Sequence, residues 1–259
     1  MVSHKKTPDG EGPGASAAER SLRLLALLAA EPRALTLAEL SQRLGLPKAT
    51  THRVCAQLME AGFLARDIDE RSVAVGPALR RLALDTLNHG TVRGLRHEVL
   101  TALVAEVGET CNFTTLDGAS VLYLDRVEAP WPWRLSLDVG TRVPLHCTAS
   151  GKLFLAHLDA PRRDALLAQL PLTRLTSNTL TTRRALRNEC EAIARQGHAL
   201  DREEFIAGLM AMAVPVRDAH GSVRAAIAVH APVARLTAEA ALARLPALQA
   251  AAQRMGELL

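Results

Sequence analysis

Residues 35–64 read "LTLAELSQRLGLPKATTHRVCAQLMEAGFL", two amphipathic runs joined by "GLP". In the first run Thr36 stands three residues before Glu39, the spacing of a capping box, in which each side chain bonds the other residue's backbone N–H. Gly45 is suited to the left-handed conformation that commonly ends a helix. The leucines at helical spacing between them are Leu37, Leu40 and Leu44. The segment therefore predicts a helix, a tight turn and a second helix.

The second helix is predicted to begin near Pro47, a residue suited to a first helical turn, and to end at Gly62. Upstream, "SAAERSLRLLALLAAEP" starts a further helix with Ser16 as its cap and Glu19 three residues on. The apolar stripe of that helix is Leu22, Leu25 and Leu28. Downstream, "FLARDIDERSVAVG" predicts two short strands around a polar turn. Three helices and a hairpin in this order predict a winged helix-turn-helix over residues 16–76.

The start of the second helix, "PKATTHR", is the part that meets base edges and phosphates in a helix-turn-helix. A helix N-terminus offers free N–H groups and a partial positive charge, and a bidentate Arg–guanine pair gives about 1–3 kcal/mol of discrimination. The predicted DNA-contacting residues are Lys48, Ala49, Thr50, Thr51, His52 and Arg53, with Arg43, Arg66 and Arg71. The alternative is a helical hairpin with a solvated charged face. It explains less, because cap, turn, helix and wing all occur in the right order.

The composition permits DNA binding without showing it. The 259-residue chain is 48% hydrophobic and 3% aromatic, with a net charge of +4 and a pI of about 9.2. That length allows one large or two modest globular domains with cores of Leu, Val and Ala. Residues 1–76 carry ten basic and nine acidic side chains, so the placement of charges matters more than their sum.

The chain's beginning and its cysteines bear on its compartment. Residues 1–15 are polar and rich in Gly and Pro, and they lack the apolar region of a signal peptide, which predicts a disordered arm. No apolar run reaches the ~18–20 residues that a membrane span needs. Cys55, Cys111, Cys147 and Cys190 form no CxxC pair, so neither disulfides nor a cysteine zinc site are expected. A reducing cytoplasm is the default.

Residues 77–90 predict an amphipathic helix that cannot bury its apolar stripe alone, which we interpret as a linker available for dimer contact. Residues 91–259 mix hairpins with helices, the pattern of an α+β domain with a largely antiparallel sheet. The predicted features are helices ending at Gly108 and Gly197, hairpin turns at Asp117-Gly118 and at "DAHG", a strand over 133–140, a helix from "TASGKLFLAHL" and a closing helix broken at Pro246.

Four segments resemble, in order, the IclR family of bacterial transcription regulators: "LTLAELSQRLGLPKATTHRVCAQLMEAGFL", "DGASVLYLDRVE", "VGTRVPLHCTASGKLFLAHL" and "ALDREEFIAGLMAMAVPVRDAHGSVRAAIAV". The resemblance implies a GAF-like effector-binding domain with a curved antiparallel sheet over residues 91–259. It also implies a ligand-responsive repressor or activator that binds double-stranded palindromic operators as a homodimer or a dimer of dimers. Small organic acids or aromatic-catabolism intermediates are the implied effectors, with no cofactor.

The resemblance places the effector between the "TASGK" loop and helix and the strands after "DREE". Backbone N–H groups at the start of that helix suit a carboxylate. Ala228 and His230 stand where family members often carry Ser, so the effector need not be that of better-known members. The implied effector-binding residues are His146, Ala149, Ser150, Gly151, Asp201, Glu204, Leu209, Ala211, Ala228 and His230. A lid over the pocket is assigned to Trp131, Trp133 and Arg134.

The sequence gives little support for a catalytic triad, a phosphate-binding loop or a metal site. Ser150, His146 and Asp201 could be written as a nucleophilic triad, but "CTASGK" is not a G-x-S-x-G elbow. "ASGKL" lacks the first Gly and the final Ser or Thr of a phosphate-binding loop. The histidines lack zinc-motif spacing, so no metal site is expected. An enzyme acting on a small acid, with the helix-turn-helix as an accessory, stays the main alternative, and a scaffold that never binds DNA is a further one.

Overall fold

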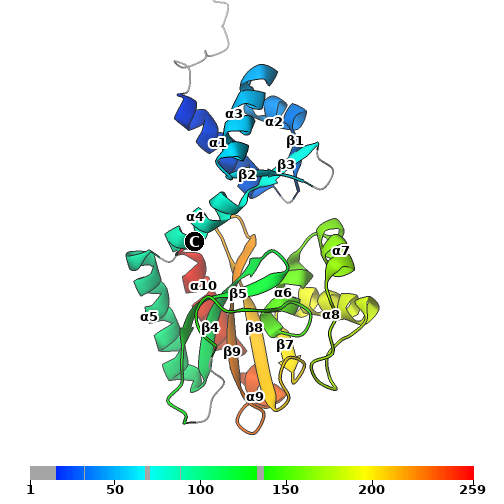
Figure 1. The fold of residues 1–259 in the computed structure, drawn as a ribbon. Coiled ribbons are helices and arrows are strands. Elements are labelled where there is room, and N and C mark those ends of the chain that lie inside the picture. The colour runs from blue at the N-terminus through cyan, green and yellow to red at the C-terminus, as the bar shows by residue number, and fades with distance from the viewer. Residues whose placement is uncertain (1–15, 32, 68–70, 88, 133–136) are drawn as a thin grey trace, which may run out of the picture. The chain divides into compact units, whose positions relative to one another are not determined.

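The computed structural model describes residues 16–31, 33–67, 71–87, 89–132 and 137–259 (Figure 1). The predicted arm over residues 1–15 lies outside this described part. The chain divides into two compact units, the first ending at Thr86 and the second beginning at Leu87. Each unit has a hydrophobic core of its own.

The first unit contains the predicted helices and wing. Its helices are α1 (Ala17–Ala30), α2 (Leu37–Leu44), α3 (Lys48–Glu60) and α4 (Pro77–Leu87). Its strands are β1 (Leu35–Thr36), β2 (Leu64–Arg66) and β3 (Ser72–Val75), which pair antiparallel in the order β1-β3-β2. The short strand β1 was not predicted, because two residues carry no detectable alternation.

The local signals for the first two helices act as predicted. The backbone N–H of Glu19 donates to Ser16 Oγ (3.1 Å), and Thr36 and Glu39 form a complete capping box at the start of α2. Gly45 ends α2 in the left-handed conformation at φ 64°. Each of these contacts satisfies backbone groups that a helix end leaves unpaired, which fixes where the helix starts or stops.

The core of the first unit differs from the prediction in one place. The predicted stripe on α1 included Leu22, which is wrong, because 67% of Leu22 is exposed. Leu24 and Leu28 form the buried face of α1 instead. The core residues are Leu24, Leu28, Leu35, Leu40, Val54, Cys55, Leu64 and Val73.

Helix α4 begins where the wing ends, and glycine makes that close approach possible. A Cβ on Gly76 would lie 2.3 Å from the carbonyl oxygen of Gly62, and the N–H of Ala78 donates to that same oxygen (3.0 Å). Helix α4 itself contains no buried residue among those whose side chains are described. It ends at Leu87, and Gly90 is the first residue of the next helix.

The second unit is built on a six-stranded antiparallel sheet in the order β6-β5-β4-β9-β8-β7. Its strands are β4 (Thr110–Asp117), β5 (Ser120–Val127), β6 (Arg142–Pro144), β7 (Ala199–Arg202), β8 (Leu209–Arg217) and β9 (Val223–Pro232). The helices are α5 (Gly90–Val107), α6 (Ala149–His157), α7 (Ala160–Gln169), α8 (Arg183–Gln196), α9 (Ala238–Ala243) and α10 (Leu245–Gly256). Helices α5 and α10 cover one face of the sheet, and α6, backed by α8, covers the other (Figure 1).

The main predicted elements of this unit are present. Gly108 and Gly197 end α5 and α8 in the left-handed conformation, the β4–β5 hairpin turns at Gly118, and Pro246 lies in the first turn of α10, which follows a break at Arg244. The strand predicted over 133–140 is not seen in its described part, since residues 137–140 form a loop and turn, and 133–136 lie outside the described residues. Strands β6 and β7 and helix α7 were not predicted. No helix in the described ranges is long and apolar enough to cross a membrane.

Candidate functional site

The N-terminal turn of α3 lies on the surface of the first unit. Lys48, Ala49, His52 and Arg53 are exposed, and Thr50 is half-buried. Pro47 occupies the N-cap position and makes no side-chain cap, and the first turn contains no acidic residue. Within the part of the chain that the structure describes, the first turn of α3 therefore has neither an acidic residue nor a capping side chain to offset its N–H groups and the positive end of its dipole.

Thr51 does not belong to this surface, and its assignment to DNA contact is wrong. Its relative exposure is 0%, and its Oγ1 donates to the carbonyl oxygen of Pro47 (3.3 Å). The reason is helical geometry: Thr51 lies three and four residues before the buried Val54 and Cys55, on the face that packs into the core. His52 and Arg53 follow on the outer side.

The remaining predicted basic residues lie at the edges of this surface. Arg66, the last residue of β2, and Arg71, which directly precedes β3, are exposed at the wing. Arg43 of α2 forms an ion pair with Glu31, which partly neutralises its charge. The side chain that best combines exposure, length and placement on α3 is therefore Arg53.

The second unit contains a small cavity between α6 and the sheet. Its volume is about 30 Å³, room for about one or two water molecules. Seven of the predicted effector residues line it: Ala149, Ser150, Asp201, Leu209, Ala211, Ala228 and His230. Six further lining residues were not predicted: Asn112, Val121, Tyr123, Val143, Thr148 and Phe205. Segments almost 120 residues apart in the chain thus converge here, because β9 lies between β4 and β8 in the sheet.

The start of α6 forms one wall of the cavity. Thr148 caps the helix: its Oγ1 accepts from the N–H of Gly151 (3.2 Å) and donates to the carbonyl oxygen of Pro144 (2.7 Å). The Gly151 N–H is therefore occupied, and a Cβ on Gly151 would lie 2.3 Å from the carbonyl oxygen of Leu145. Gly151 is absent from the cavity lining, and its assignment to ligand binding stays a prediction. It permits close packing, while Ala149 and Ser150 line the cavity.

Asp201 places a carboxyl group on the side of the cavity opposite the start of α6. Its Oδ1 accepts from the N–H groups of Glu204 (2.7 Å) and Phe205 (3.3 Å), which fixes the carboxyl group at the end of β7. Burial raises the pKa of Asp201 to about 7, while the two N–H donors act in the other direction. A carboxyl group that takes up a proton near neutral pH is suited to contact an anionic ligand as a hydrogen-bond donor.

Glu204 is absent from the cavity lining, and its contact with ligand stays a prediction. Its carboxylate forms an ion pair with Lys152, whose Nζ also lies 3.2 Å from Glu189 Oε1. Lys152 has a relative exposure of 0%. Lys152 is not among the predicted residues, because a lysine in "TASGKLFLAHL" gives no signal of complete burial.

His146 also lies outside the cavity lining, contrary to the prediction. Its Nε2 lies 2.9 Å from the carbonyl oxygen of Thr173, so the ring ties the loop before α6 to the chain after α7. A triad of His146, Ser150 and Asp201 is therefore not assembled at this cavity. Within the described ranges no group of three His, Cys, Asp or Glu residues is placed to hold a metal ion.

The lid residues are only partly described. Trp131 donates its Nε1–H to the carbonyl oxygen of Gly108 (2.9 Å), and the Arg235 guanidinium lies 4.9 Å from its ring centre. Trp131 is absent from the cavity lining, and its role as a lid stays a prediction. Trp133 and Arg134 lie outside the described residues.

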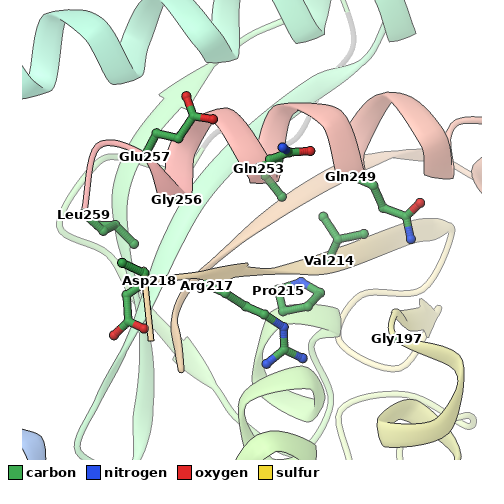
Figure 2. A pocket seen from close by; sticks show the side chains of 12 residues that line it. Gly197, Val214, Pro215, Arg217, Asp218, Gln249, Gln253, Gly256, Glu257 and Leu259 are labelled. Carbon is green, nitrogen blue, oxygen red and sulfur yellow. The ribbon is translucent and has the colours of Figure 1, made fainter. Parts of the chain in front are cut away.

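A larger and more open groove of about 600 Å³ lies beside α10 and the end of β8 (Figure 2). Two of its charged side chains are engaged within the β8–β9 hairpin: Arg217 donates to the carbonyl oxygen of Gly221, and Asp218 accepts from Arg224 (2.6 Å). None of the predicted site residues lines it. The small cavity, which gathers seven of them, is therefore the candidate ligand site.

A winged helix with an exposed helix start, joined to a separate unit with a polar cavity, defines a DNA-binding regulator that responds to a ligand. Comparisons with known proteins specify the class. Residues 17–67 match the IclR helix-turn-helix domain, and residues 84–256 match the C-terminal domain of the bacterial transcriptional regulator IclR. The chain belongs to the IclR family of bacterial transcription regulators.

Individual relatives agree with this membership. The chain is 40% identical over 240 residues, 93% of its length and 95% of the relative's, to the "Probable transcriptional regulator SauR" of Cupriavidus necator. It is similar to the crystal structure of the Thermotoga maritima IclR, with 25% identity, a TM-score of 0.62 and coverage of 93% and 97% of the two chains. A Microbacterium hydrocarbonoxydans IclR homologue, solved with 4-hydroxybenzoate, has 28% identity, a TM-score of 0.58 and coverage of 94% and 99%. The relatives are named as regulators, so the enzyme alternative finds no support.

Proposed function

We propose that the chain binds double-stranded operator DNA through Lys48, His52 and Arg53 of α3, with Arg66 and Arg71 of the wing on adjacent phosphates. The observation that carries this proposal is the exposed, uncapped N-terminus of α3, which has no acidic residue in its first turn. Such an end attracts phosphate, and a long donor side chain beside it reaches base edges.

The test is an Arg53→Ala variant. The wild-type protein first selects its preferred duplex from a random DNA pool, and both proteins are then titrated with that duplex and with a scrambled one. Loss of a bidentate base contact should weaken the selected duplex by about 1–3 kcal/mol and the scrambled duplex less. Arg184→Ala, an exposed arginine on α8 of the second unit, is the matched control. Equal losses on both duplexes would reduce Arg53 to a phosphate contact.

The effector is proposed to be a small carboxylic acid that binds in the cavity of the second unit. Its carboxylate would face the N-terminus of α6 at Ala149 and Ser150, with Asp201 on the opposite wall. At 30 Å³ the cavity must widen for any carboxylic acid, and it must widen least for a small one. Ser150→Leu should fill the cavity and abolish thermal stabilisation by small carboxylates, while affinity for the selected duplex is kept.

The working form is proposed to be a cytoplasmic homodimer or dimer of dimers. Apolar side chains at the surface of the first unit support this assembly: Leu22 of α1 is 67% exposed and Leu82 of α4 is 52% exposed. A ligand that favours one arrangement of two DNA-binding units, by about 1–3 kcal/mol, would change operator affinity. Sedimentation analysis of the wild type and of a Leu22→Ser, Leu82→Ser variant tests this, since a monomeric wild type would contradict it.

A further inference from the structure

Three polar side chains on neighbouring strands form a chain of contacts at the cavity wall. Asn112 of β4 stands opposite Arg126 of β5 and opposite Ala228 of β9, so its side chain shares a sheet face with both. His230, two residues after Ala228, projects from that same face. Arg126 Nη1 lies 3.3 Å from Asn112 Oδ1, and Asn112 Nδ2 lies 2.9 Å from His230 Nδ1. Asn112 and His230 both line the cavity.

The donors and acceptors in this chain admit one consistent arrangement. A guanidinium group only donates hydrogen bonds, so the Asn112 atom that faces Arg126 must be the amide oxygen. The amide nitrogen, which only donates, then faces His230, and His230 Nδ1 must accept. Turning the amide over would place its NH₂ group against the guanidinium, two donors 3.3 Å apart. A protonated imidazole would likewise set its Nδ1–H against the Asn112 NH₂ group.

We propose that Arg126 and Asn112 hold His230 as the neutral imidazole with its proton on Nε2, so that His230 presents a hydrogen-bond donor to the ligand cavity. Arg126 and Asn112 are positioning residues: the first orients the amide, and the second selects the tautomer of the histidine. Nε2 is itself a buried atom, so the proton it carries points into the protein interior and not into solvent.

The Nε2–H donor of His230 restricts the chemical class of the ligand more than the cavity alone does. This inference rests on the proposal that the cavity is the effector site. The neighbouring Ala211 and Ala228 offer no side-chain hydrogen bond at this wall. The ligand group that complements an Nε2–H donor is an acceptor oxygen, as a carboxylate or a keto acid carries. An ammonium group in that position would meet a donor and be excluded.

The tautomer can be read directly from ¹⁵N spectra of the intact protein labelled in histidine, because the protonated and bare ring nitrogens of a neutral imidazole have distinct shifts. The His230→Gln spectrum identifies the signals of His230 by their loss. Near neutral pH the wild type should show the proton on Nε2. A proton on Nδ1, or a doubly protonated ring, would overturn the inference.

Two variants test the positioning residues. Asn112→Asp replaces the donor that faces His230 by an acceptor of the same shape, so the proton should move to Nδ1 or the ring should become doubly protonated. Arg126→Met removes the group that orients the amide, so a mixture of tautomers should appear. Arg142→Met is the control: Arg142 is an exposed arginine of the neighbouring strand β6 that pairs with Asp117 (2.7 Å), and its loss should leave the His230 signals unchanged. An unaltered tautomer in both test variants would contradict the proposed roles.

The donor role is tested with acetate as the probe. Gln at position 230 keeps an N–H donor near the place of Nε2, whereas Leu keeps the volume without a donor. Acetate affinity should fall about tenfold or more in His230→Leu and less than about threefold in His230→Gln. Equal losses in the two variants would overturn the donor role. If acetate, glyoxylate and propionate all fail to bind the wild type while the tautomer is as inferred, the carboxylate assignment fails and the Arg126–Asn112–His230 arrangement stands.

Discussion

Lys152 and Glu204 form an ion pair in the interior of the second unit, directly behind the cavity wall. Lys152 has no exposed surface, Glu204 is buried, and Glu189 of α8 provides a second carboxylate 3.2 Å from the Lys152 Nζ. The pair joins α6 to the loop after β7 that positions Asp201. Charges taken out of water are stable only when their partners stay in place, so each partner depends on the other.

Lys152→Met should destabilise the second unit strongly, because it leaves the Glu204 carboxylate buried without its cation. The expected loss is about 3–5 kcal/mol in the free energy of unfolding, measured by urea titration. Glu189→Gln should cost less than about 1 kcal/mol, because Glu189 is partly exposed to water. Adding Glu204→Leu to Lys152→Met should recover most of the loss. A small loss of unfolding free energy in Lys152→Met alone would show that the Glu204 carboxylate pairs with another group or takes up a proton.

Asp201 should make stability depend on pH near neutrality. Burial raises the pKa of Asp201 to about 7 from an ordinary value of 3.8, so the folded state holds a proton that the unfolded state loses above about pH 4. The free energy of unfolding should therefore fall between about pH 4 and pH 7 and level off above, by up to about 4 kcal/mol. Asp201→Asn, which keeps the acceptor for the two N–H donors, should remove this contribution and be more stable than the wild type at pH 8.

Urea titrations of the wild type and of Asp201→Asn from pH 5 to pH 8 measure how the free energy of unfolding of each protein changes with pH. Asp164→Asn is the control, because Asp164 is an exposed partner of Arg187 on the surface of α7. It should leave the pH dependence of the wild type unchanged. If Asp201→Asn and the wild type have parallel pH profiles, Asp201 is already ionised in the folded protein.

The sequence predicted best what local chemistry decides. Caps at Ser16 and Thr36 and the left-handed glycines at Gly45, Gly108 and Gly197 mark helix ends through contacts within a few residues. Most of the cavity residues followed from the family resemblance, because those positions lie on motifs that can be matched one by one. The exposure of individual side chains and their contact partners were predicted least well, because both depend on tertiary packing.

Particular residues show why. Leu22 and Leu24 have the same chemistry, and only the position of α1 against its neighbours decides that Leu24 is buried. Lys152 is buried because Glu204, 52 residues later, turns toward it. Asn112 gave one weak signal, an amide inside an otherwise buried strand. Its partners His230 and Arg126 become visible only once β9 and β5 are placed on either side of β4.

Thr51 and His52 should separate packing from DNA contact on adjacent positions of α3. Thr51→Val removes the hydroxyl that donates to the Pro47 carbonyl oxygen but keeps the buried volume. It should change unfolding free energy by about 1 kcal/mol and leave affinity for the selected duplex intact. His52→Ala should instead keep the unfolding free energy and weaken binding to the selected duplex, because His52 is exposed beside Arg53. Duplex titration and thermal unfolding of each variant make the comparison. A loss of DNA affinity in a fully folded Thr51→Val protein would contradict the buried placement.

Two helical glycines should respond to alanine in opposite directions. A Cβ on Gly151 would lie 2.3 Å from the Leu145 carbonyl oxygen and 2.5 Å from its Cα, and backbone atoms have little freedom to move away. Gly151→Ala should therefore displace the start of α6 and lower the unfolding free energy by about 1–3 kcal/mol or more. Gly94 lies in α5 with nothing within 4 Å of its added Cβ, so Gly94→Ala should raise stability by about 0.5–1 kcal/mol. Urea unfolding of both variants measures the pair, and a stabilising Gly151→Ala would mean that α6 does not approach Leu145 as closely as described.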